Sequence, residues 1–161
     1  MGSDKTVQTR YNIQKNKLMG IDYLCKPNLK LAIVVWDGSV NWNYWQEHLH
    51  RIFSDPAYAP MQMQITDLRF SSIGPTIADD EIHAMRDLLA DQRERLSLKK
   101  IAIVAGDEWR KLKLAEFVLQ TISVNSIVFN DLSTACVWLG VNVVEVGQDI
   151  KQLRIKLRQN P

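Results

Sequence analysis

The sequence predicts an α/β fold: a single domain with an open, mixed sheet of about five strands. Three observations support this fold class. Short β-branched apolar runs alternate with amphipathic segments, turn residues separate them, and the first two strands follow each other without a helix between them. The expected order is β-β-α-β-α-β-α-β-α, with an antiparallel hairpin at the N-terminus and parallel strands after it. A chain of 161 residues is long enough to bury one sizeable core.

The opening hairpin is the first pair of elements. Residues 20–26 (GIDYLCK) alternate apolar and other side chains, as a half-buried strand does. A Pro-Asn turn leads into residues 30–36 (KLAIVVW), which are apolar enough for a more deeply buried strand. Asp37-Gly38 is typical of a turn and is expected to end that strand.

Two amphipathic helices flank the third strand, which we expect over residues 61–68. Asn41 is the expected N-cap of the first helix, and Thr76 or Asp79 is the expected N-cap of the second. The apolar residues at helical spacing, expected to face the core, are Trp42, Trp45, Leu49, Ile52, Phe53, Ile82, Met85, Leu88, Leu89 and Leu96.

The C-terminal half adds two strands and two helices. A buried strand is predicted within residues 98–107, followed by a helix over 108–122, a strand within 125–131 and a short helix over 132–139 that stops at Gly140. From the strands, the residues expected in the core are Ile33, Val35, Ile65, Ile101, Ile103 and Val128. From the helix over 108–122, they are Leu112, Ala115, Leu119 and Ile122.

The chain divides into three parts. Residues 1–17 are polar and lack apolar periodicity, which indicates a flexible arm before a domain over residues 18–140. Residues 141–161 form a C-terminal extension whose apolar positions fit either a helix capped by Asp149 or an alternating strand, and we expect the helix. Its basic residues, expected on a solvated face or against an acidic partner or lipid head groups, are Lys151, Arg154, Lys156 and Arg158.

Composition narrows the classes of function. Hydrophobic residues make up 46% of the chain and charged residues 24%, as in soluble globular proteins. The net charge of +2 gives no reason to expect nucleic-acid binding. No apolar run reaches the ~20 residues of a membrane helix, so we expect a cytoplasmic protein that is not integral to a membrane. The two cysteines, Cys25 and Cys136, are expected to be reduced thiols.

The sequence contains no motif that carries chemistry. It has neither a glycine-rich phosphate loop nor a nucleophile elbow. The three histidines, His48, His50 and His83, do not have the spacing of metal ligands. We therefore expect no catalytic residues, no cofactor and no metal site, and hence a protein that is not an enzyme.

Four stretches resemble the bacterial STAS-like proteins, the SpoIIAA-like group that is also described with SEC14-type domains. They lie within residues 20–140 and read GSVNWNYWQEHL, SDPAYAPMQMQITDLR, KKIAIVAGDEWRKLKLAEF and VFNDLSTACVWLG. The resemblance implies a small mixed sheet with helices against it, in a non-catalytic protein that works by binding. In the anti-sigma-factor antagonists of this fold, a partner kinase phosphorylates a serine within an Asp-Ser-Ser-Gly step. Here the corresponding place reads FSSIG, without the aspartate and with an extra residue before the glycine.

Two hypotheses of function follow. The first is a regulatory protein-interaction module of STAS-like type, phospho-regulated at a loop that carries Ser71, Ser72 and Thr76. In this hypothesis Trp42 and Trp45 form a contact surface, and the chain binds an unknown protein partner or a second copy of itself as a homodimer. A simpler alternative for the loop is that Thr76 caps a helix and the serines solvate a turn. The second hypothesis, which the SEC14 comparison implies, is a carrier or sensor of a small apolar ligand.

Overall fold

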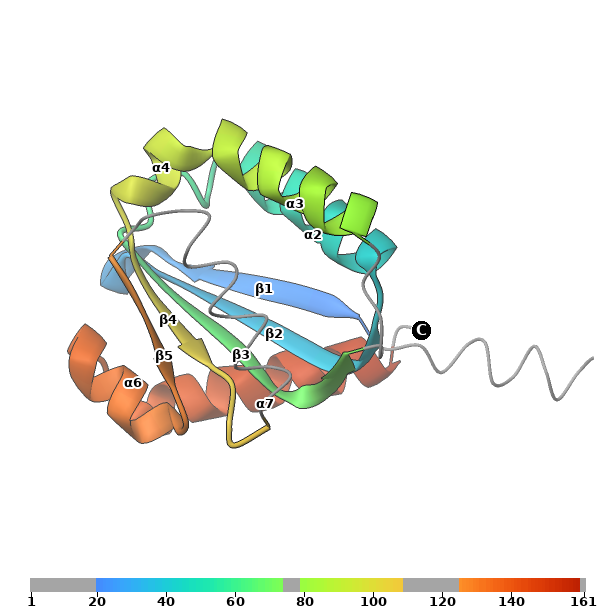
Figure 1. The fold of residues 1–161 in the computed structure, drawn as a ribbon. Coiled ribbons are helices and arrows are strands. Elements are labelled where there is room, and N and C mark those ends of the chain that lie inside the picture. The colour runs from blue at the N-terminus through green and yellow to red at the C-terminus, as the bar shows by residue number, and fades with distance from the viewer. Residues whose placement is uncertain (1–19, 74–78, 109–124, 160–161) are drawn as a thin grey trace, which may run out of the picture.

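Five strands form one sheet, and they lie side by side in chain order, β1-β2-β3-β4-β5. The computed structural model describes residues 20–73, 79–108 and 125–159 (Figure 1). β1 and β2 are antiparallel, and every later neighbour pair is parallel. The predicted fold class, an open mixed α/β sheet with an N-terminal hairpin, is confirmed. The strands are β1 (Ile21–Lys26), β2 (Leu31–Val40), β3 (Met63–Ile73), β4 (Lys100–Val104) and β5 (Ser126–Phe129).

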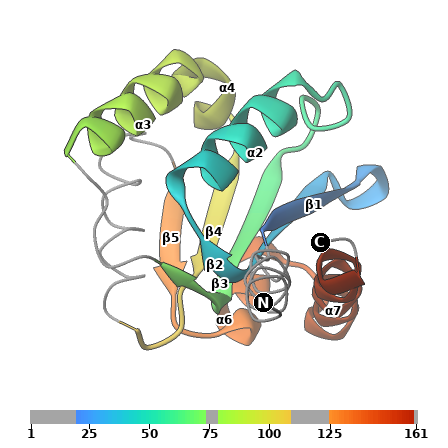
Figure 2. The ribbon, with the colours of Figure 1, turned by 90° about the vertical axis from the view of Figure 1, so that its right-hand side faces the viewer.

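Helices cover both faces of the sheet. In Figure 1, α2, α3 and α4 lie above the sheet and α6 and α7 lie below it, and Figure 2 shows the same layers from the side. α2 begins after Asn41, the predicted cap, whose side chain accepts a hydrogen bond from the Tyr44 N–H at 3.0 Å. The helices are α2 (Trp42–Ser54), α3 (Asp79–Asp91), α4 (Arg93–Ser97), α6 (Leu132–Leu139) and α7 (Val143–Gln159), and a 3-10 turn, η1 (Pro27–Leu29), joins β1 to β2.

The sheet separates the core into two apolar clusters because successive strand residues point to opposite faces. Toward α6 and α7, β2 and β3 contribute Ile33, Val35 and Ile65, each fully buried. Ile101 and Ile103 of β4 are buried on the other face, toward α2. These five core predictions are confirmed. Val128 is only half-buried, which corrects its prediction, because β5 is the last strand of the described sheet.

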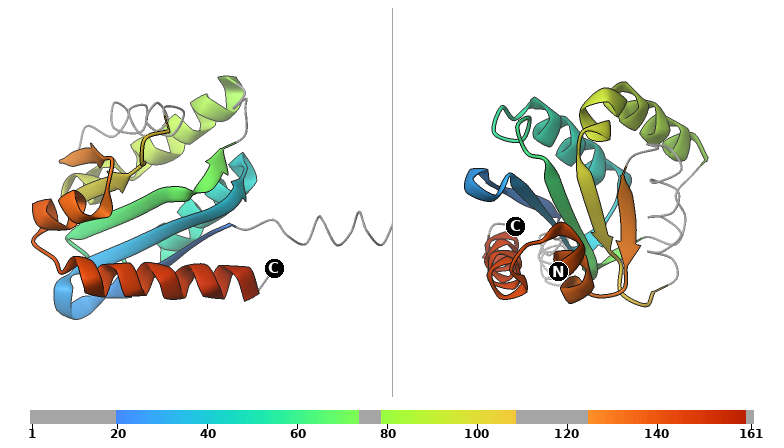
Figure 3. Two further views of the ribbon diagram at one scale, coloured as in Figure 1. Left: turned by 90° about the horizontal axis from the view of Figure 1, so that it is seen from below. Right: turned by 90° about the vertical axis from the view of Figure 1, so that its left-hand side faces the viewer.

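α7 is an integral layer of the fold. The helix prediction for the C-terminal residues is confirmed, and Figure 3 shows α7 lying along the sheet. Its apolar residues Val146, Ile150 and Leu153 are buried in the cluster with β2 and β3. The predicted cap is wrong: the Asn142 side chain accepts hydrogen bonds from the N–H groups of residues 144 and 145, so the helix begins earlier. Asp149 lies within the helix.

Two other boundaries differ from expectation. β2 does not end at Asp37-Gly38 but continues to Val40, because β3 remains paired with it as far as Ile73. A bulge accommodates the irregularity: Val35 pairs with Asp67 and Asp37 with Phe70, so β3 holds one extra residue. The helix expected to end at Leu96 is divided into α3 and α4 near Gln92.

Some expectations fall on residues that the structure does not describe. These are the arm over 1–17, Thr76, the side chain of Ile82, and all but the first residue of the helix over 108–122 with its predicted core positions. Within the described ranges, no helix is long and apolar enough to cross a membrane.

The placement of α7 predicts how two isoleucines of that helix respond to truncation. Ile150→Ala should lower the free energy of unfolding by about 2–4 kcal/mol, because Ile150 is buried against the sheet and the change leaves a cavity. Ile155→Ala is the matched control, because Ile155 is 39% exposed on the same helix, and it should cost less than about 1 kcal/mol. Urea denaturation measures both, and equal costs would contradict this placement.

Candidate functional site

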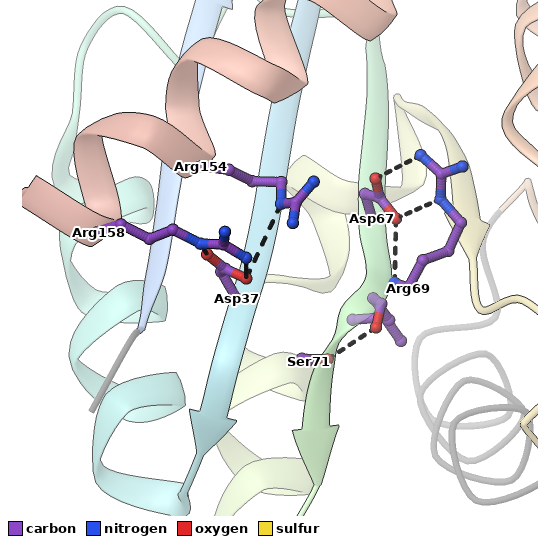
Figure 4. Close-up of polar contacts among 7 residues, drawn as sticks. Asp37, Asp67, Arg69, Ser71, Arg154 and Arg158 are labelled. Atoms are coloured by element: carbon purple, nitrogen blue, oxygen red, sulfur yellow. Dashed lines mark hydrogen bonds and ion pairs between the residues drawn. The ribbon is translucent and has the colours of Figure 1, made fainter. Parts of the chain in front are cut away.

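Two aspartates are buried on neighbouring strands, Asp37 in the C-terminal half of β2 and Asp67 of β3 level with the last residue of β4. Asp37 and Asp67 are 1% and 0% exposed, which is unusual for carboxylates and requires paired charges. Both point to the sheet face that α6 and α7 cover, and Figure 4 shows them on neighbouring strands with three arginines around them. In an open α/β sheet, ligands and partners usually bind at the carboxyl ends of parallel strands. This edge is therefore the candidate functional site.

Asp37 is held by α7. The Arg158 Nε–H donates to Asp37 Oδ2 at 2.8 Å and an Arg158 Nη–H donates to Oδ1 at 3.2 Å, so the contact is bidentate. Hydrogen bonding to Asp37 raises the pKa of Arg158. Arg154 approaches from the previous helical turn, with its Nε 3.8 Å from Asp37 Oδ1. The C-terminal end of α7 is thereby fixed to β2 at Asp37.

Asp67 is held within its own strand. Its Oδ1 accepts hydrogen bonds from the backbone N–H of Arg69 at 3.0 Å and from Arg69 Nε at 2.9 Å. Oδ2 accepts from an Arg69 Nη at 2.9 Å. Hydrogen bonding to Asp67 raises the pKa of Arg69. Both oxygens of this buried carboxylate are therefore used in a structural ion pair.

Phe70 lies close to two of these arginines. The Arg154 guanidinium carbon is 3.5 Å from the centre of the Phe70 ring, and that of Arg69 is 5.0 Å from it. Such cation–π contacts restrain both the ring and the cations. The Phe70 side chain is nevertheless 38% exposed, so this edge of the sheet presents a fixed aromatic ring to solvent.

The predicted serines lie on a strand and not in a loop. Ser71 and Ser72 belong to β3, opposite Gly38 and Ser39 of β2. Ser71 is buried and its hydroxyl donates to the Leu68 carbonyl at 2.8 Å, so it is not accessible for modification. Ser72 is exposed, with its Oγ 3.3 Å from Ser39 Oγ. Of the predicted hydroxyls that the structure describes, Ser72 is thus the accessible one.

The tryptophans of α2 are mostly core residues. Trp45 is 7% exposed and packs edge-to-face between Trp36 and Trp42, at ring-centre distances of 5.5 and 6.0 Å. It fills the space between α2 and the sheet, so its assignment to a contact surface is corrected. Trp42 is half-buried and keeps part of its ring in solvent.

A small cavity lies on the opposite side of the sheet, beneath α2. Its volume is about 80 Å³, and its lining is mainly apolar, with Trp45, Leu49, Leu89 and Ile103 among the contributing residues. His48 also lines it, is 5% exposed, and has no hydrogen-bond partner for Nδ1 in the described part of the chain. Burial lowers the pKa of His48 to about 3, so the imidazole is neutral at physiological pH.

The remaining chemistry-bearing residues have structural settings. Cys25 and Cys136 are free thiols, and burial raises the pKa of each. The Asp131 side chain accepts a hydrogen bond from the Thr134 N–H at the start of α6, which lowers the pKa of Asp131. Across the described residues, no three His, Cys, Asp or Glu side chains are placed to hold one metal ion.

Comparisons with known proteins find no match for this chain, either among protein-family models or among curated proteins.

The sequence predicts two serines of this site, Ser71 and Ser72, but does not predict its buried charges. Asp37 was assigned to a turn, and Arg154 and Arg158 to a solvated helix face. A signal for Asp37 did exist, because an acid directly follows six apolar residues of a buried strand. Nothing in the local sequence marks His48 as a cavity residue.

The Asp37 contact predicts a difference between two acids that both bind α7. Asp37→Asn should lower the free energy of unfolding by about 2–4 kcal/mol, because it leaves arginine charge without its buried partner. Asp22→Asn is the control, because the two cations that pair with Asp22, Lys156 and Arg51, have side chains that are 63% and 51% exposed, and it should cost less than about 1 kcal/mol. Urea denaturation at neutral pH measures both, and a smaller cost at Asp37 than at Asp22 would refute its anchoring role.

His48 predicts a specific acid sensitivity. In the unfolded chain this group binds a proton below its ordinary pKa of 6.5, whereas in the folded chain it does so only near pH 3. Burying His48 in its neutral form therefore costs no proton-binding free energy above pH 6.5. As the pH falls from 6.5 toward 3, the free energy of unfolding decreases by at most about 1.4 kcal/mol per pH unit. His48→Leu should make the loss of unfolding free energy between pH 7 and pH 5 smaller than in the wild type. Parallel pH profiles from urea denaturation would show that His48 is solvated.

Proposed function

We propose that this chain is a non-catalytic, regulatory protein-interaction module of STAS-like type that works in the cytoplasm. Its contact surface is the carboxyl-end surface, which consists of Ser39, Phe70, Ser72 and Arg158. The observation that carries the proposal is Phe70, a 38% exposed aromatic ring in contact with two arginines. Aromatic and arginine side chains are enriched in protein interfaces, and a restrained ring loses little conformational entropy on binding.

The state of the acids supports binding over catalysis. General acid–base chemistry needs a carboxyl group within reach of a substrate proton. Asp37 and Asp67 are instead buried and engaged by Arg158 and Arg69. Removing either carboxylate would break the packing of α7 or the strand bulge, so these charges serve the architecture of the surface.

Phosphorylation of Ser72 is the proposed regulation. Ser72 pairs with Ser39 two positions beyond the Asp37–Phe70 pair, so its side chain shares the face with both of those residues. A phosphate adds about two negative charges and three acceptor oxygens. It would compete with Asp37 for Arg158, whose side chain is 51% exposed and can turn toward it. Modification would thereby alter the contact surface and the end of α7 together.

A second candidate function is a carrier or sensor of a small apolar ligand. The observation that favours it is the cavity of about 80 Å³ beneath α2, with His48, whose Nδ1 has no hydrogen bond to any described residue. This volume is far below the 300–1,000 Å³ of a typical pocket for a drug-sized ligand. The cavity therefore suits a much smaller molecule than a lipid.

Quantitative affinity capture with purified wild type and variants tests the interaction module. Phe70→Ala should reduce the recovery of a specific bound protein at least tenfold, because it removes the restrained ring from the proposed interface. Ser72→Asp should reduce recovery as well, and Ser72→Ala should leave it near the wild-type level. Val137→Ala is the matched control, because Val137 is 78% exposed on α6, away from the carboxyl-end surface.

Light scattering on the same samples separates two kinds of partner. A mass twice that of the chain, lost in Phe70→Ala, would identify the partner as a second copy and support the expected homodimer. Equal recovery of the same protein by Phe70→Ala and Val137→Ala, with a monomeric mass for both, would overturn the proposed surface.

A further inference from the structure

Among the described residues that line the cavity beneath α2, one buried polar atom has no hydrogen-bond partner. The other polar side chains of its lining form a chain of their own. Tyr58 Oη–H donates to Gln64 Oε1 at 2.6 Å, and Gln64 Nε2 donates to Thr66 Oγ1 at 2.9 Å. Among the described lining residues, the buried polar atom without a hydrogen bond is His48 Nδ1. Leaving a buried polar atom unpaired is costly, so a partner from outside the chain is expected.

We propose that this cavity binds a small neutral molecule with an apolar body and one hydroxyl group, which hydrogen-bonds to His48 Nδ1. This inference rests on the second candidate function and gives its ligand class. A cavity of roughly 150 Å³ accepts benzene, and a water molecule occupies about 30 Å³. A volume of about 80 Å³ therefore fits a molecule of about three or four non-hydrogen atoms, such as a short-chain alcohol.

The charge of the site selects a neutral ligand. His48 is neutral and buried, so it offers no ionic partner to a carboxylate or an amine. The nearby cation Arg51 is directed elsewhere, because one of its Nη groups donates to the Ile21 carbonyl at 2.9 Å and lies 3.4 Å from Asp22 Oδ1. Bringing a charged ligand into this apolar space would cost far more than one hydrogen bond returns.

The hydroxyl group suits either state of the imidazole. A neutral histidine carries its proton on one of the two ring nitrogens, so Nδ1 is either a donor or an acceptor. A hydroxyl can donate or accept, whereas a ketone can only accept. The apolar part of the ligand would contact Leu49, Leu89 and Ile103, which are buried apolar residues of the cavity lining.

The competing explanation for the unpaired nitrogen is one ordered water. Water would satisfy Nδ1 but would leave most of the apolar lining without contacts. A pair of probes distinguishes the two explanations: xenon, which fills apolar cavities and forms no hydrogen bond, and 1-propanol, which carries the hydroxyl.

The experiment titrates both probes by NMR into wild type, His48→Leu and Leu89→Phe, with folding of each variant checked by its amide spectrum. Wild type should bind xenon and 1-propanol, and 1-propanol but not xenon should shift the ¹⁵N resonance of His48 Nδ1. His48→Leu should weaken 1-propanol binding at least tenfold while changing xenon binding less than twofold. Leu89→Phe fills the cavity and should abolish both. The Nδ1 shift in wild type keeps the test decisive if His48→Leu does not fold.

The outcomes separate the inference from the function on which it rests. Absence of xenon binding in wild type would overturn the cavity itself, and with it the carrier or sensor function. Xenon binding with no Nδ1 shift on addition of 1-propanol, or equal 1-propanol affinity in wild type and His48→Leu, would overturn only the hydroxyl assignment.

Discussion

The placement of α7 depends on one carboxylate, Asp37, that is buried within β2. Apolar burial of Val146, Ile150 and Leu153 draws the helix onto the sheet but does not by itself choose one register along it. Asp37 fixes this register, because a fully buried carboxylate is tolerated only where a cation pairs with it. In the observed position of α7, Arg158 is that cation. In the first turn of the helix, Glu145 lies 2.7 Å from Lys26 of β1. Two ion pairs at opposite ends thus define where the apolar face lies.

The bulge between β2 and β3 connects this anchoring to the candidate surface. In a regular strand, residues 67 and 70 would point to opposite faces of the sheet. Because β3 holds one extra residue opposite β2, both Asp67 and Phe70 point toward the face of α6 and α7. The Arg69 side chain can then donate hydrogen bonds to Asp67, and Arg154 of α7 can stack on Phe70. A single inserted residue therefore places an aromatic ring beside two arginines.

The fold class was predictable because buried apolar residues recur with the period of the strand or helix that carries them. The site was less predictable because it depends on contacts between segments that are distant in the sequence. Asp37 looks like a turn residue locally, and only the continued pairing of β3 makes it part of a strand. Asp149 looks like a helix cap, yet Asn142 caps α7, and Asp149 is instead used by Lys26 from the first strand. His48 fits the buried face of an amphipathic helix, and a cavity beside it arises from the imperfect packing of several elements, which no single segment encodes.

The edge of β1 restricts where this chain can contact a partner. An edge strand with free backbone groups is a template for pairing with a second chain. In β1, however, an Arg51 Nη donates to the Ile21 carbonyl, and the Asp22 side chain accepts from the Tyr23 N–H, on the edge that faces away from β2. Pairing there would require breaking both contacts and desolvating Arg51. For the proposed interaction module, the carboxyl-end surface is therefore a better contact than this β1 edge, because Phe70 is exposed there without any backbone group having to be released.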